Sequence, residues 1–437
     1  MSAGSTVGNG WCFGADGADD LGAALGNFLG SLGARPRLLG IGEPMHGEEE
    51  FPRLRNRVFE RLVEREGYRS VAIESDCLAA LKVDDFVAGG EGPLDDAMES
   101  GFSHGFGKLD ANHELVAWMR EHNRDRAPED RLRFYGFDAP IEVTGAASPR
   151  QALVALHGHL AAHLEAALLP CSLETIDGLI GDDGRWTDPA AAIDPSQSVG
   201  ASREANELRL LADDLLSVLT SESPRLVAAA PEEDRWRACL YGRTAAGLLR
   251  YHAAMADGSG TRADRIGRLM ARRDATMFEN LQAIVAREAR RGPTLVFAQN
   301  AHLRKHRSTM QLGFGGVKVG DRPAGWEDLE GRTVSWWSAG AIAAAQMGDR
   351  YAFLDSALGF APERGLGVPD PDTLEGALYA VTEDRCIFGS KRLAETVRGR
   401  SPKLTSRTDT STIRGYFPLD PDRLDGTDGV VFIKDIN

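Results

Sequence analysis

Residues 38–48 read LLGIGEPMHGE, a short apolar run that ends at Glu43 and continues into a turn carrying His46. A run of this length that is apolar throughout is typical of a strand buried on both faces. Residues 48–65 then place apolar side chains along one arc of a helix. Strand, turn and helix in this order predict one unit of a sheet with helices packed against it.

Short apolar runs closed by polar residues recur along the rest of the chain. They lie at 70–73 before Glu74 and Asp76, at 132–137 before Asp138, at 294–298 before Gln299, Asn300 and His302, at 333–337, at 351–354 before Asp355, and at 430–433 before Asp435. Helical patterns such as residues 276–290 lie between them. Strands that alternate with helices predict an α/β fold with a mostly parallel central sheet flanked by helices.

The middle of the chain differs in composition. Residues 148–271 are rich in Ala and Leu, with helical stretches at 152–169, 202–219 and 232–255 around the loop signal GDDG at 181–184. We predict a helical insertion over 148–271 that covers the cleft of the sheet. The α/β catalytic core then comprises 31–147 and 272–437, after an N-terminal segment of 1–30. The polar stretch 401–411 predicts a surface loop.

The charge of the chain limits its expected partners. A net charge of -15 and a pI of about 5.2 give an acidic surface. Such a surface repels phosphate backbones and anionic lipid. We therefore expect a small-molecule substrate, with neither nucleic acid nor a membrane as a partner. The sequence leaves the oligomeric state open.

The cysteines and the N-terminus bear on the compartment. The five cysteines are odd in number and form no CxxC pair, which predicts scattered buried thiols in a reducing compartment: Cys12, Cys77, Cys171, Cys239 and Cys386. Residues 1–10 lack the charged and apolar regions of a signal peptide. No apolar run approaches the roughly 20 residues that span a bilayer. These features predict a cytoplasmic protein.

Polar side chains follow several of the predicted strands. In open α/β sheets, ligands bind beyond the carboxyl ends of the strands. Here those ends carry Glu43, His46, Glu74, Asp138, Gln299, Asn300 and His302. Segments far apart in the sequence would thus deliver histidines and carboxylates to one rim, which predicts an active site there.

His46 is the first candidate for a general base. Histidine titrates near neutral pH, and as a base it needs a partner that fixes its tautomer and stabilises the imidazolium. Glu43 and Glu74 are candidates for that partner. The alternative interpretation is a solvated histidine beside the acidic run 48–50.

Three further side chains are candidates for the site, His302 as a catalytic residue and Arg55 and His104 as supporting residues. Arg55 falls about 40° from Phe51 on a helical wheel, so it lies inside the apolar arc and must be paired. It would hold Glu74 or face the pocket; the alternative is an arginine at the edge of the stripe. His302 would polarise a carbonyl or protonate a leaving group, unless it is only a hydrogen-bonded residue at a strand end. His104 lies in FSHGFG at 102–107 and is the third candidate. The alternative interpretation of this segment is a loop packed by its two Phe rings.

Several common catalytic signatures are absent from the sequence. No predicted strand runs directly into a GxSxG elbow or a GxGxxG loop, there is no HExxH or P-loop, and GFGG at 313–316 lacks the Lys-Ser/Thr pair of a phosphate loop. A serine hydrolase with a nucleophile elbow and a nucleotide-dependent enzyme are both disfavoured.

A set of segments resembles one known family. The segments are GEPMHG at 42–47, Glu50-Phe51 and Arg55, VAIESD at 71–76, RFYGFD at 133–138, residues 273–281, and residues 296–302. Together they resemble the erythromycin esterase family, from about residue 35 to the C-terminus. The family commonly has His-Asn-x-His at the last of these segments, whereas this chain has Gln299 at the first position and retains His302. Glutamine cannot shuttle a proton at neutral pH.

The resemblance implies an α/β core with a helical insertion and a cleft between them. It also implies hydrolysis of a macrolide lactone without a covalent acyl-enzyme and without a cofactor. The water-activating position of the family matches His46, the acidic positions match Glu43 and Glu74, and the basic position matches Arg55.

Three hypotheses follow from the sequence. The first is a metal-independent hydrolase in which His46 activates water to attack an ester or lactone of a macrolide or other natural product, with Arg55, Gln299 and His302 binding the oxyanion or substrate. The second is a biosynthetic tailoring enzyme that uses the same base for cyclisation, elimination or acyl transfer. The third is a metal-binding hydrolase in which Glu43, His46, Glu74 and His302 are the ligands.

Overall fold

A computed structural model describes most of the chain. The described residues are 10–15, 17–142, 145–312, 329, 331–399, 402–410 and 415–436. The glycine-rich stretch 313–316 and residues 1–9 lie outside them. Within the predicted surface loop, the guanidinium of Arg407 is buried and donates hydrogen bonds to the backbone carbonyls of Leu358 and Gly359. That part of the loop packs into the molecule, which the polar composition did not indicate.

The predicted sheet is present. Eight strands lie in the order β1-β11-β12-β10-β2-β7-β3-β4. Their bounds are β1 (Trp11–Phe13), β2 (Leu38–Glu43), β3 (Ser70–Asp76), β4 (Arg133–Asp138), β7 (Thr294–Gln299), β10 (Tyr351–Phe360), β11 (Arg385–Gly389) and β12 (Gly429–Asp435). The six strands from β12 to β4 are parallel, and β11 pairs antiparallel with both β12 and β1. The prediction of a mostly parallel α/β fold is confirmed.

One predicted strand belongs elsewhere. β9 (Thr333–Trp337) pairs antiparallel with β8 (Arg307–Gln311) in a separate two-stranded sheet. Its side chains alternate, since Val334 and Trp336 are buried while Trp337 is 57% exposed. The prediction of a strand buried on both faces was therefore wrong for this segment, because only one face of β9 packs, against α11 (Arg262–Arg287).

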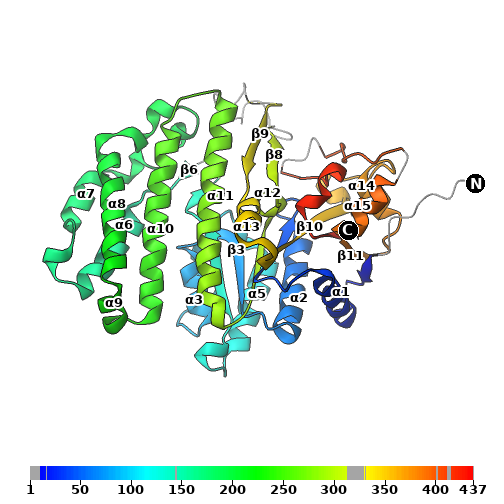
Figure 1. Ribbon diagram of the computed structural model, residues 1–437, viewed down its shortest axis with the longest axis horizontal. Coiled ribbons are helices and arrows are strands. Elements are labelled where there is room, and N and C mark those ends of the chain that lie inside the picture. Colours follow the sequence, from blue (N-terminus) through cyan, green and yellow to red (C-terminus); the bar gives the residue numbers. More distant parts are fainter. Residues whose placement is uncertain are drawn as a thin grey trace, which may run out of the picture.

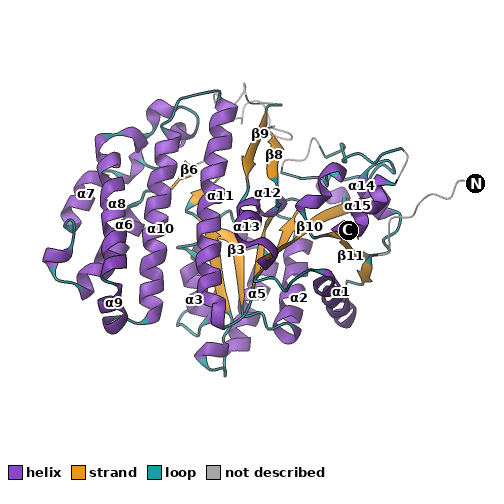
Figure 2. Cartoon of the chain, in the orientation of Figure 1, coloured by secondary structure: helices purple, strands orange, loops and turns teal. Residues whose placement is uncertain are grey.

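Helices cover both faces of the central sheet (Figure 2). On one face, side chains of β2, β3 and β7 share a core with helices that include α1 (Ala18–Ser31), α2 (Glu50–Arg65), α3 (Ala80–Val87), α4 (Leu94–Gly101) and α5 (Asp110–Asn123). On the other face the same strands pack on α11 and α13 (Ala339–Met347). Near the C-terminus, α14 (Leu374–Tyr379) and α15 (Ser390–Arg398) pack on β10, β11 and β12. α2 is the helix predicted to follow the strand that ends at Glu43, which is β2.

The middle of the chain is helical and lies beside α11 (Figure 1). Its helices are α6 (Arg150–His163), α7 (Leu173–Ile180), α8 (Arg203–Ser221), α9 (Ser223–Ala229) and α10 (Glu232–Met255), and they share a hydrophobic core of their own. α11 runs without a break from this region onto the sheet, so the expected boundary at 271–272 falls inside a helix. The division into core and insertion stays a prediction.

Two cysteines are joined, contrary to the prediction of free thiols. Cys12 and Cys386 face each other in the β1–β11 register and form a disulfide. Of the other three, Cys77 is buried, Cys171 is half-buried and Cys239 is exposed. The paired cysteines are 374 residues apart, so only the neighbouring positions of the two edge strands bring them together. No helix in the described part of the chain is long and apolar enough to cross a membrane.

A buried carboxyl in α14 gives a prediction for stability. Burial raises the pKa of Glu375 to about 7, against partial compensation from the Leu419 backbone N–H. An acid whose pKa is higher in the folded state than in the unfolded state stabilises the fold while it is protonated. This contribution to stability is lost as the pH rises from the unfolded-state pKa through 7. Between pH 5 and pH 8, the free energy of unfolding should fall less in Glu375→Gln than in the wild type, by more than about 1 kcal/mol. Urea unfolding at pH 5 and pH 8 measures it.

The control for this prediction is Glu279→Gln, which removes an exposed partner of Arg250. This variant should keep the pH dependence of the wild type. If Glu375→Gln loses as much stability between the two pH values as the wild type does, the assignment to Glu375 is incorrect.

Candidate active site

The expected rim exists at the carboxyl ends of four neighbouring strands. β2, β7, β3 and β4 are adjacent and parallel, and they end at or near Glu43, Gln299, Glu74 and Asp138. Gly42 allows the side chain of Asn300 to lie close to the backbone of β2, because a Cβ at residue 42 would overlap that side chain. Asn300 itself is buried and bonds both to the Ser356 carbonyl and to the Ser356 N–H. Asn300, the first residue of α12 (Asn300–Leu303), thus links the end of β7 to β10.

Glu43 and His46 form a hydrogen-bonded pair. The Nδ1 atom of His46 lies 2.6 Å from Oε1 of Glu43, and the turn between β2 and α2 is closed by Gly47 at a φ of 78°. Glu43 is buried, with 4% of its side chain exposed, whereas 39% of the His46 side chain is exposed. The ring of Phe106 packs 5.3 Å from that of His46. The carboxylate thus fixes the ring through Nδ1, and Nε2 has no hydrogen bond to the described residues.

The electrostatics of this pair favour a proton on His46. Burial acts to lower the pKa of His46, but the hydrogen bond to Glu43 and the charges of Glu74 and Glu43 outweigh it and raise that pKa to about 9. Burial also raises the pKa of Glu43, although His46 opposes this effect. The neutral imidazole that can act as a base therefore becomes more abundant as pH rises above neutrality.

Glu74 is bound at both of its oxygens. Its Oε1 lies 3.1 Å from Nη2 of Arg273 and 3.3 Å from Nε2 of His302, and its Oε2 accepts the backbone N–H of Gln299 at 2.8 Å. Burial would raise the pKa of Glu74, but the positive charges of His302, His46 and Arg273 lower it to about 2. Glu74 is therefore a fixed negative charge next to His46 and cannot itself take a proton during a reaction near neutral pH.

His302 is held between two carboxylates. Its Nδ1 lies 2.9 and 3.0 Å from the two oxygens of Asp274, and its Nε2 faces Glu74. The side chain is buried. We predicted that His302 polarises a carbonyl or protonates a leaving group. The contacts differ from that expectation, because neither ring nitrogen is directed at open space.

A second cluster lies around Asp138. Both of its oxygens accept hydrogen bonds from Arg273, at 2.5–3.1 Å, and its Oδ2 lies 3.3 Å from Nε2 of His104. His104 is the one non-glycine residue of the described chain with a left-handed φ, at 57°, and it packs on the same Phe106 ring as His46. Strained backbone of this kind concentrates at functional sites. The rings of His104 and His46 therefore both pack on the ring of Phe106.

Arg55 does not hold Glu74. Its guanidinium donates to Oδ1 of Asn56 at 2.7 and 3.0 Å and to Oδ1 of Asn112 at 2.8 Å, and it lies over the ring of Phe297. Burial lowers the pKa of Arg55 to about 9, while the charge of Glu43 acts in the opposite direction. The expected contact with Glu74 is made by Arg273 instead, because α11 faces that carboxylate and the amides of α2 and α5 take up the Arg55 donors.

Gln299 is tied to a distant segment. Its side-chain amide donates to the Gly415 carbonyl at 3.0 Å, and the backbone of Phe417 donates to the Pro44 carbonyl within the His46 turn. The residue that differs from the family pattern thus helps to hold the segment 415–419 beside the site.

Arg273 and Asp274 were not among the predicted site residues. Both are buried in α11, on a stretch where Met270 and Met277 are buried as well. The helical-wheel argument used for Arg55 applies here, because Arg273 is three residues after one methionine and four before the other. That signal was present in the sequence.

One group of described side chains has the spacing of metal ligands. Atoms of Glu74, His104 and Asp138 lie within 4.8 Å of one another. However, the guanidinium of Arg273 contacts all three, so a divalent ion would have to displace a buried cation that is already paired. The residues present do not fit a metal at this position.

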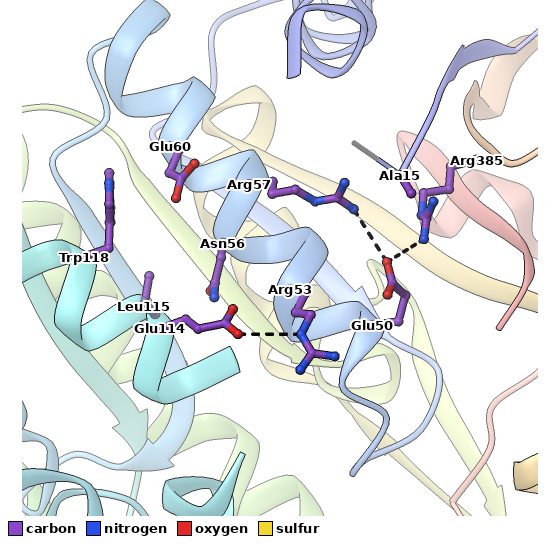
Figure 3. A pocket seen from close by; sticks show the side chains of 10 residues that line it. All are labelled: Ala15, Glu50, Arg53, Asn56, Arg57, Glu60, Glu114, Leu115, Trp118 and Arg385. Atoms are coloured by element: carbon purple, nitrogen blue, oxygen red, sulfur yellow. Dashed lines mark hydrogen bonds and ion pairs between the residues drawn. The ribbon is translucent and has the colours of Figure 1, made fainter. Parts of the chain in front are cut away.

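The cavity in Figure 3 lies around the start of α2 and has a volume of about 280 Å³. Glu50 is placed between Arg57 and Arg385, and Arg53 faces Glu114. None of the predicted site residues lines it. These are ion pairs at the surface of α2 and not part of the His46 cluster.

A sheet that gathers histidines and carboxylates beyond its carboxyl edge is typical of enzymes of the α/β class. The family model for erythromycin esterases matches residues 63–436, and the chain belongs to the erythromycin esterase family. This membership supports a hydrolase-like function.

Three solved structures have a similar fold. A protein from Bacillus cereus has a TM-score of 0.67 and 17% identity, covering 99% of this chain and 93% of that one. A succinoglycan biosynthesis protein has a TM-score of 0.62 and 15% identity, covering 96% and 92%. A histidine-to-asparagine mutant of the erythromycin esterase EreC, in its open conformation, has a TM-score of 0.60 and 16% identity, covering 92% and 91%. At these identities the likeness concerns the fold.

Proposed function

We propose that this protein hydrolyses an ester or lactone of a small natural product, with His46 as the general base. One observation carries the proposal: His46 is the most exposed member of a cluster whose other ionisable members are paired and, apart from the half-buried His104, buried. Its Nδ1 is fixed by Glu43, and its Nε2 has no hydrogen bond within the described residues. A base oriented in this way can take a proton from a water molecule that attacks a carbonyl.

Direct attack by water fits the hydroxyl and thiol groups around the end of β3. The hydroxyl of Ser75 bonds to Ser103, and burial raises the pKa of the Cys77 thiol to about 12, so the thiolate is scarce. Neither hydroxyl has a hydrogen bond to a histidine. A covalent nucleophile needs an adjacent base or a lowered pKa. These groups have neither, which supports a hydrolysis without an acyl-enzyme.

The oxyanion of the reaction needs a hydrogen-bond donor. We predicted Arg55, Gln299 and His302 for this role, but the first and last are buried and bonded, and the Gln299 amide is bound to Gly415. The Nε2 of His104 is also occupied, by Asp138 and Arg273, but 16% of the side chain is exposed and the ring packs on Phe106, so the donor we propose is its Nδ1. We therefore place the substrate carbonyl between the two histidines, over Phe106.

The test of this function is turnover by the purified protein. A panel of macrolide lactones and simple aryl esters is incubated with the enzyme, and the products are identified by mass. Hydrolysis adds one water to the substrate, whereas a tailoring reaction by the same base leaves the mass unchanged or transfers a group. A product without added water, formed from a good substrate, would replace hydrolysis by tailoring chemistry.

The pH profile gives a second prediction for His46. Because the base must be neutral and its pKa is raised to about 9, kcat/KM should increase with pH from neutrality toward 9. Glu43→Gln keeps an oxygen that can accept from Nδ1 but removes the negative charge that raises this pKa, so the acidic limb should move to lower pH by about one unit or more. Initial rates on one ester between pH 5 and 10 measure both profiles. Superimposable limbs would exclude His46 paired with Glu43 as the titrating base.

A further inference from the structure

Behind His46, buried charges of alternating sign form a chain. It runs from Asp274 through His302, Glu74 and Arg273 to Asp138, with contacts of 2.9, 3.3, 3.1 and 2.5 Å between successive members. All five side chains are buried. Arg273 and Asp274 are consecutive in α11, so one helix supplies both a cation and an anion to the cluster. A buried charge is tolerated only when it is paired.

The contacts of Asp274 show that it accepts hydrogen bonds at both oxygens. Oδ2 accepts the indole N–H of Trp336 at 2.9 Å, and Oδ1 accepts the backbone N–H of Ala339 at 2.8 Å. The carboxylate therefore has no proton to offer to His302. The Nδ1 atom of His302, at 2.9–3.0 Å from both oxygens, must carry the hydrogen.

The surroundings of the other ring nitrogen, Nε2, also favour a bound hydrogen. Glu74 accepts from the Gln299 N–H and from Arg273, so it is an ionised acceptor. Nε2 of His302 lies 3.3 Å from Oε1 of that carboxylate, an ion-pair contact without hydrogen-bond geometry, where an unprotonated nitrogen would direct its lone pair at a negative charge. The charged groups facing His302 are Asp274 and Glu74, which favour the imidazolium, and Arg273, which opposes it. With both nitrogens protonated, the ring is a cation.

We propose that Asp274 is a positioning residue that keeps His302 doubly protonated, and that this imidazolium holds Glu74 in place beside His46. His302 then acts as a fixed cation, comparable to Arg273, and does not exchange its proton during turnover. The role in turnover rests on the proposed function, whereas the charge state of His302 does not. The two parts can therefore fail separately.

The first experiment reads the charge state without a substrate. The ten histidines are labelled with ¹⁵N, ring ¹H–¹⁵N correlations are recorded between pH 6 and 9, and His302 is assigned by the loss of its signal in His302→Gln. We expect both His302 nitrogens to be protonated throughout this range. If His302→Gln does not fold, the signal is assigned by its shift in Trp336→Phe, because Trp336 bonds to the Asp274 partner of His302. A His302 ring in the folded wild type with one protonated nitrogen at pH 7 would overturn the proposal.

The second experiment changes Asp274. In Asp274→Asn, which keeps the shape and removes the charge, His302 should lose one ring proton within the same pH range. Trp336→Phe removes one hydrogen bond to Asp274 but keeps its carboxylate, so His302 should stay doubly protonated. Asp84→Asn is a control for the loss of a buried carboxylate, because Asp84 pairs with Arg133 near the start of β4. A doubly protonated His302 in Asp274→Asn would contradict the proposal.

Kinetics test the consequence for catalysis on any ester that the enzyme turns over. Asp274→Asn should lower kcat about tenfold with KM little changed, because it disturbs the group beside the base and not the substrate. Asp84→Asn should leave kcat unchanged. Equal kcat in Asp274→Asn and the wild type, with His302 shown to be neutral, would remove the positioning role while leaving the assignment of the charge state intact.

Discussion

His46→Asn is expected to lower kcat/KM for ester hydrolysis by about 10²- to 10⁴-fold, the range that a general base contributes. Asparagine preserves hydrogen bonding to Glu43 but has no nitrogen that can accept a proton at neutral pH. The loss should appear mainly in kcat, since the base acts on the attacking water. Initial rates on the best ester from the panel measure the effect.

The matched control is His163→Asn, which changes a histidine at the end of α6 in the helical region. It should retain wild-type rates. Both variants should have the circular dichroism and the thermal transition of the wild type, because His46 is a partly exposed turn residue. Unchanged turnover in a folded His46→Asn protein would exclude His46 as the base.

Arg273→Met is expected to destabilise the protein by about 3–5 kcal/mol, because it leaves buried carboxylates without their cation. Arg273 makes hydrogen bonds to Asp138 and to Glu74, both of which are buried. Methionine approximates the length of the aliphatic stem but cannot pair with either group. Urea unfolding at pH 7 measures the change, and activity should fall as the cluster rearranges.

The control for Arg273→Met is Arg237→Met, which breaks pairs with Asp85 and Glu233. Those carboxylates are partly exposed, and surface ion pairs contribute about 1 kcal/mol or less. The difference in the free energy of unfolding between the two variants measures the effect of burying the paired charges. Equal losses in the two variants would show that the Arg273 cluster is no more than a set of surface-like ion pairs.

The sheet and the rim of the site follow from sequence for a physical reason. Apolar runs followed by polar residues mark strands and their carboxyl ends, and parallel strands bring those ends to one edge. The neighbourhood of Glu43, Glu74, Asp138 and Gln299 was therefore predictable before any coordinates. The pairing of Glu43 with His46 needed only that both residues lie in one short turn.

The partners of the arginines could not be derived in this way. A helical wheel shows that Arg55 and Arg273 point into the molecule, but the partner depends on which face of the sheet each helix covers. α2 and α11 lie on opposite faces, and only α11 reaches Glu74 and Asp138. The disulfide of Cys12 with Cys386 depends on the order of the edge strands, which local sequence does not encode.

The most direct test of the account is the mass of the intact protein during turnover. A single turnover of a good ester is stopped with acid at times shorter than product release, and the chain is weighed. The account, in which His46 activates water, predicts the unmodified mass at every time, with product increasing. A chain that gains the mass of the acyl part of the substrate, and loses it as product forms, would contradict direct attack by water.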